Sequence, residues 1–142
     1  MDTGLAATPR DAFVDGSWHA THRRFAVRDP FDGAHLADVT DADDALVAAA
    51  IAAAARAFPA WKRRPAAERG KLLEAMAVRM HDQERALAEL CTRENGKPVK
   101  ESLAEVRYAA SFLHWFASEA ERMYGELIPA SHPVTINAIS GY

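Results

Sequence analysis

The chain has 142 residues, 49% of them hydrophobic, which is enough for one domain with a core. Its 20 acidic and 17 basic side chains are mixed along the sequence and give a net charge of −3, so no basic stripe indicates a nucleic-acid partner. One cysteine excludes an internal disulfide, and we expect a cytoplasmic protein without a secretory leader, a membrane-spanning run or a membrane partner.

The first forty residues predict small antiparallel β structure. Residues 1–11 are expected to be loose. Asp15-Gly16 stands between apolar residues, which is a strong hairpin signal. Short strands are expected at 25–28 and 35–40, where apolar residues lie between turn signals. The predicted β region is therefore 12–40.

Helices are predicted from residue 42 to residue 124. The first follows an acidic start at 41–44 and is expected to end near Phe58-Pro59. The second begins at Pro65. The third, either separate from the second or continuous with it, ends at the turn Asn95-Gly96.

The fourth predicted helix is the centre of the fold. No glycine or proline lies between Pro98 and Gly125, and Gly125 is expected to cap its end. The helix carries two apolar stripes. The first consists of Leu103, Val106, Ala110, Leu113, Ala117 and Ala120, and the second consists of Tyr108, Phe112, Trp115, Phe116 and Met123. Because a surface helix carries one such stripe, we expect contacts on two sides.

Residues 125–142 hold the last expected element, a strand at 134–139. This strand is expected either to return to the N-terminal hairpin or to pair with chain that is absent here. The fold class is thus α+β and helix-rich, with a β-hairpin region, about four helices and a terminal strand.

The candidate nucleophile and the candidate metal ligands both have simpler explanations. Cys91 follows Leu90 on an apolar face late in a predicted helix, where cysteine behaves as a small hydrophobe. His19 and His22, with Asp15 nearby, have a spacing that could bind a metal, but no third ligand is in phase. We expect a structural role for Cys91 and no metal site.

Carboxylates on the long helix raise the question of acid–base catalysis. They are Glu101, Glu105, Glu119 and Glu121, and basic residues lie among them. A solvated face with ion pairs three and four residues apart is the expected interpretation, and paired catalytic carboxylates are the alternative. None of the seven glycines forms a phosphate-binding loop. Composition and spacing alone therefore predict a helix-rich domain without an active site.

Several motifs, in order over residues 13–129, resemble the N-terminal part of the aldehyde dehydrogenase superfamily. Five of them are FVDGSW at 13–18, DPFDG at 29–33, AAARAFPAW at 53–61, PAAER at 65–69, and ENGKP at 94–98 followed by Glu101 and Glu105-Val106. Two further stretches, YAASFLHWF at 108–116 and YGELIP at 124–129, are most similar to the succinate-semialdehyde dehydrogenase group.

The resemblance implies an NAD- or NADP-dependent oxidation of a small aldehyde to a carboxylic acid. In that chemistry a thiolate attacks the carbonyl, hydride leaves to nicotinamide, and water releases the thioester. The family's oxyanion-binding Asn, Gly-rich cofactor turn, general-base Glu and nucleophilic Cys all lie beyond the point that matches Tyr142. No catalytic or cofactor-binding residue is therefore carried over, Cys91 does not match the nucleophile, and this chain is expected to bind no cofactor.

Only minor functional positions are carried over by the resemblance. Tyr108, Phe112 and Trp115 match the helix that borders the substrate entrance in the family, and core packing is the equally weighted alternative. Val27 and Glu94 match a region that in some members offers backbone oxygens to a monovalent cation.

We therefore expect residues 12–142 to be part of the family's N-terminal cofactor-binding domain, lacking its Rossmann-like core. Such a segment would be ended early, inactive by itself and left with an exposed apolar patch, whereas the family's full enzymes are homo-oligomers. The alternative is a non-enzymatic helical interaction module that binds an intact homologous dehydrogenase.

Overall fold

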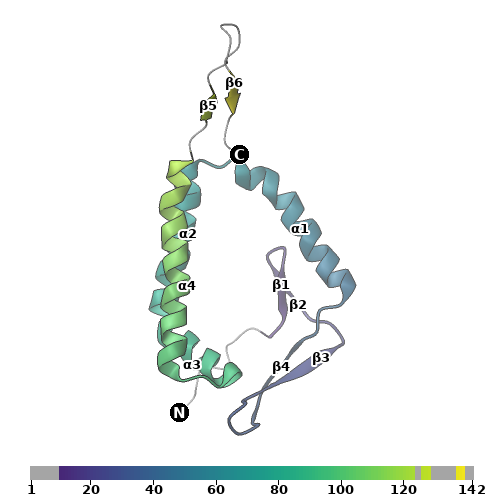
Figure 1. Cartoon of the computed structure of the whole chain (residues 1–142). Coiled ribbons are helices and arrows are strands. Elements are labelled where there is room, and N and C mark those ends of the chain that lie inside the picture. The colour runs from purple at the N-terminus through teal and green to yellow at the C-terminus, as the bar shows by residue number, and fades with distance from the viewer. Residues whose placement is uncertain (1–9, 124–125, 129–136, 140–142) are drawn as a thin grey trace.

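The computed structural model describes residues 10–123, 126–128 and 137–139. The elements in chain order are β1 (Ala12–Val14), β2 (Ser17–His19), β3 (Arg24–Arg28), β4 (His35–Thr40), α1 (Asp44–Lys62), α2 (Ala66–Asp82), α3 (Glu84–Asn95), α4 (Val99–Glu119), the 3₁₀ turn η2 (Ala120–Arg122), β5 (Glu126–Ile128) and β6 (Asn137–Ile139). Figure 1 shows α2 and α4 side by side, with α1 standing apart from them.

The first hairpin forms where the sequence predicts it. Asp15 and Gly16 join β1 to β2 with positive φ angles of 51° and 81°, as a tight two-residue hairpin turn requires. Phe13 lies opposite Trp18 in the register, and their ring centroids are 4.9 Å apart. The turn and this cross-strand aromatic pair together account for the hairpin.

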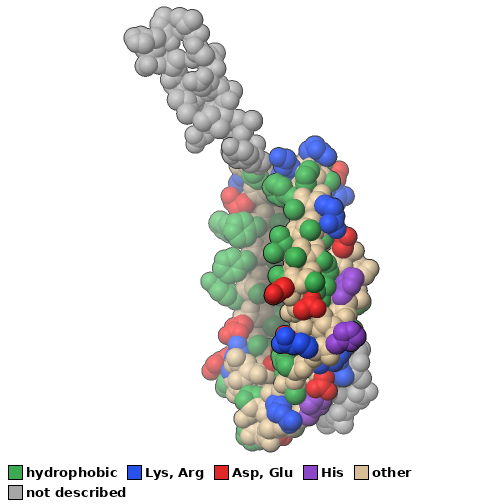
Figure 2. All heavy atoms as spheres, turned by 90° about the vertical axis from the view of Figure 1, so that its right-hand side faces the viewer, with side chains coloured by type: hydrophobic (Ala, Val, Ile, Leu, Met, Phe, Trp, Pro, Cys, Tyr) green, Lys and Arg blue, Asp and Glu red, His purple; other side chains and the backbone are tan. Residues whose placement is uncertain are grey.

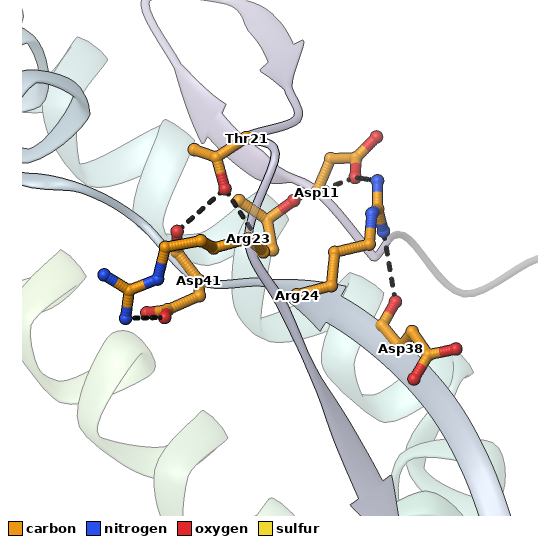
Figure 3. A network of polar contacts seen from close by, with 7 residues as sticks. Asp11, Thr21, Arg23, Arg24, Asp38 and Asp41 are labelled. Carbon is orange, nitrogen blue, oxygen red and sulfur yellow. Dashed lines mark hydrogen bonds and ion pairs between the residues drawn. The ribbon is translucent and has the colours of Figure 1, made fainter.

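A polar network joins the second hairpin, β3–β4, to the residues before β1 (Figure 3). The Arg24 guanidinium donates to the Asp11 carboxylate at 2.6 Å and to the Asp38 carbonyl oxygen at 3.1 Å. The Thr40 hydroxyl donates to the same Asp11 oxygen at 3.0 Å, and the Thr40 N–H donates to the Arg10 carbonyl. The hydrogen bond from Arg24, followed by that from Thr40, lowers the pKa of Asp11. Residues 1–9 lie outside the described part of the chain.

Helix α1 begins as expected and ends later than expected. The Asp43 carboxylate accepts a hydrogen bond from the Leu46 N–H at 2.8 Å, which caps the first turn. The predicted end near Pro59 is wrong by about one turn, because the helix continues to Lys62. Proline removes one backbone hydrogen bond but leaves those of the following residues available.

Helix α1 also differs from the expectation that no segment could span a membrane. It is long and apolar enough to do so by length and composition, a test that core helices of soluble proteins also pass. Its hydropathy comes largely from alanines, which add little apolar area each. Ala53 is its one buried residue, and α1 is tied to the first hairpin by an ion pair between Arg56 and Asp15 at 3.0 Å.

The core lies between α2, α3 and α4 and is built mainly from small residues. A Cβ on Gly70 of α2 would lie only 2.8 Å from the backbone carbonyl oxygen of Ala117 on α4, so the two helices are in backbone contact there. The Ser102 hydroxyl of α4 is fully buried and is hydrogen bonded to the Thr92 hydroxyl of α3 at 2.8 Å. Buried alanines complete this core, namely Ala77, Ala88, Ala110 and Ala117.

The helix boundaries show whether α2 and α3 are continuous and where α3 and α4 end. Gln83 separates α2 from α3, so these are two helices rather than one. Gly96 ends α3 in the left-handed conformation with φ 85°, as the turn signal predicts. Helix α4 ends earlier than the sequence predicts, because a 3₁₀ turn follows Glu119. Gly125, the expected cap, lies outside the described residues.

The last strand pairs with neither expected partner. Strand β6 is antiparallel to β5, and Leu127 lies opposite Ala138 in the register. Residues 134–136, the first half of the expected strand, lie outside the described residues. A nearby segment after α4 therefore supplies the partner strand, and the N-terminal hairpins are not involved.

The chain exposes more surface than its mass predicts for a closed fold. A compact monomer of 15.5 kDa exposes about 7,200 Å². This chain exposes 10956 Å².

Candidate functional site

The residues expected at a substrate entrance lie together on one exposed face of α4. Tyr108, Phe112 and Trp115 are 66%, 46% and 62% exposed, and Phe116 is exposed beside them. We call these four residues the aromatic face. At 100° per residue they cluster on the side of the helix opposite the first apolar stripe.

The two apolar stripes of α4 differ in burial. Every member of the first stripe is buried or half-buried against the neighbouring helices. Within the described residues the second stripe is not covered, and its exposed aromatic side chains match the expectation of an exposed apolar patch. The Tyr108 and Phe112 rings contact each other edge to face, with centroids 4.8 Å apart at 75°.

A charged pair fixes the position of α4 next to α3. The Arg107 guanidinium donates two hydrogen bonds, of 2.9 and 2.8 Å, to the two carboxylate oxygens of Glu84. These bonds lower the pKa of Glu84 and raise the pKa of Arg107. Together with the Gly70–Ala117 contact, this pair orients the helix that carries the aromatic face.

Two of the four acidic residues that could have formed a catalytic pair, Glu105 and Glu119, are instead paired with cations. Glu105 forms an ion pair with Lys97, and this hydrogen bond raises the pKa of the lysine ammonium. Glu119 forms an ion pair with Arg122 at 2.6 Å. Such exposed pairs are typical of a solvated face.

The remaining candidate side chains are dispersed. Cys91 is half-buried on α3, and His22 is exposed. His19 lies with its Nε2 atom 3.2 Å from the Val14 carbonyl oxygen. Among residues 10–123, 126–128 and 137–139, no three His, Cys, Asp or Glu side chains come together. Within this part of the chain the aromatic face is therefore the strongest candidate for contact with a ligand.

The described residues do not fit a dinucleotide. The one place where a strand leads directly into a helix is the connection from β4 to α1, and it carries Asp41 and Asp43 in place of glycines. Carboxylates there would repel a pyrophosphate, which favours a glycine-rich turn and a helix N-terminus. NAD or NADP would have to be held by residues other than these.

Phe116 extends the aromatic face, as its place in the second apolar stripe predicts. The close contact at Gly70 is not predicted from the sequence, although an isolated glycine within a helical pattern often marks a close approach. An open groove runs beside that contact, and it is lined by Gly70, Lys71, Glu74, Ala117, Ser118, Glu121 and Arg122.

Comparison with known proteins gives one consistent family. Residues 18–140 match the Aldehyde dehydrogenase family. The chain is 42% identical over 121 residues to the mitochondrial succinate-semialdehyde dehydrogenase of Rattus norvegicus, covering 85% of this chain and 23% of that protein. It is 41% identical over 122 residues to 3-sulfolactaldehyde dehydrogenase of Pseudomonas putida, covering 84% of this chain and 25% of that protein. The chain spans about a quarter of the length of these curated relatives.

Solved structures share the arrangement of the elements. An NADP-dependent enzyme of E. coli superposes with a TM-score of 0.86 at 37% identity, over 92% of this chain and 27% of that one. Betaine aldehyde dehydrogenase of Staphylococcus aureus superposes with a TM-score of 0.89 at 28% identity, over 96% of this chain and 28% of that one. The open arrangement seen here is therefore also the arrangement of this segment within longer chains.

Proposed function

The chain belongs to the aldehyde dehydrogenase family, and we propose that it serves as the N-terminal part of an NAD(P)-dependent enzyme that oxidises a semialdehyde to a carboxylic acid. The observation that carries this proposal is the identity of about two residues in five to succinate-semialdehyde dehydrogenases across most of the chain. A glutarate-semialdehyde dehydrogenase of Pseudomonas aeruginosa is 39% identical over 126 residues and supports the same substrate class.

In this proposal the chain supplies scaffold and one wall of the substrate entrance. The aromatic face offers apolar ring surface and the Tyr108 hydroxyl. Tyr108, Phe112 and Trp115 would contact the aldehyde on its way in. The cofactor and the reacting thiolate belong to other parts of the enzyme, so the isolated chain is inactive. We also propose a cytoplasmic homo-oligomer for the complete enzyme.

A chimera tests the assignment directly. Residues 18–140 would replace the matching segment of the rat succinate-semialdehyde dehydrogenase, and NAD(P)H formation would be followed with succinate semialdehyde, glutarate semialdehyde and 3-sulfolactaldehyde. We expect turnover of at least one semialdehyde by the chimera and none by the 142-residue chain. A soluble, folded chimera without turnover would refute the proposed function. If the 142-residue chain turns over a semialdehyde, and still does so after Cys91→Ala, the proposal that the isolated chain is inactive is refuted.

The exposed surface favours a second candidate function, a helical module that binds an intact homologous dehydrogenase. Exposed apolar side chains such as Ile51, Tyr108 and Trp115 are what such a binding role would use. Figure 2 shows hydrophobic side chains gathered along a hollow on the face that carries α1. Pull-down of purified intact succinate-semialdehyde dehydrogenase by the chain at micromolar concentration tests it, and failure to bind removes this candidate.

A further inference from the structure

We draw no further inference here: the strongest candidate, the open groove between α2 and α4 beside the contact of Gly70 with Ala117, is walled by exposed or half-buried charged side chains, and nothing among the described residues shows what ligand would occupy it.

Discussion

Replacement of Gly70 tests the backbone contact between α2 and α4. A Cβ at this position would lie 2.8 Å from the Ala117 carbonyl oxygen, which is closer than Cβ atoms approach in real structures. Alanine gains about 0.8–1.0 kcal/mol over glycine from helix propensity. Forcing extra atoms into a packed contact costs about 1–3 kcal/mol. Gly70→Ala should therefore destabilise the helix pair by up to about 2 kcal/mol, whereas propensity alone predicts stabilisation.

Native-state hydrogen exchange of the α2 and α4 amides measures this change without requiring the whole chain to unfold in one step. Gly70→Val adds two methyl groups at the same contact, and we expect it to cost about 2 kcal/mol or more. Ala75→Gly is the matched control, because Ala75 is exposed on the same helix. It should lose about 1 kcal/mol from propensity alone.

Whether Gly70→Ala makes amide exchange faster or slower shows whether the close contact between α2 and α4 exists. Slower exchange in both helices, by the full propensity gain, would mean that no close contact exists at this position. Faster exchange confined to α1 would likewise contradict the reasoning, because the contact joins α2 to α4. Faster exchange in α2 and α4 together is the result that the contact predicts.

Three other changes follow from local geometry. Gly96→Ala should destabilise the chain by more than about 1 kcal/mol in urea unfolding, because φ is 85° and its Cβ would lie 2.8 Å from the Pro30 side chain; unchanged stability would contradict this. Asp43→Ala removes the cap of α1 and should cost about 1 kcal/mol, seen as faster amide exchange in the first turn of α1 and nowhere else. The pKa of Asp11 is lowered from 3.8 chiefly by Arg24, so the folded state binds its proton less readily than the unfolded state. The stability from this pair is present above pH about 4 and lost as the pH falls through the lower folded value; melting temperatures of the parent chain and Asp11→Asn should therefore converge in acid, and a constant difference would refute the linkage.

Local features of the fold could be predicted because their causes are local. The Asp15-Gly16 turn, the Asp43 cap and the left-handed Gly96 each depend on a few neighbouring residues. The long α4 also follows from the absence of glycine and proline over its length. The predicted ends of α1, near Pro59, and of α4 differ from the observed ends. A helix end depends on competition among several backbone hydrogen bonds, so the identity of one residue does not determine it.

The sequence by itself determined the helical segments, the two stripes of α4 and the family resemblance, which the match over residues 18–140 bears out. Only the tertiary structure decided which stripe is covered, because periodicity identifies a face but not the surface that meets it. It also decided the pairing of Arg107 with Glu84 across 23 positions and the approach of Gly70 to Ala117. These contacts depend on how α2, α3 and α4 turn back on one another, and no local pattern in the chain encodes that path.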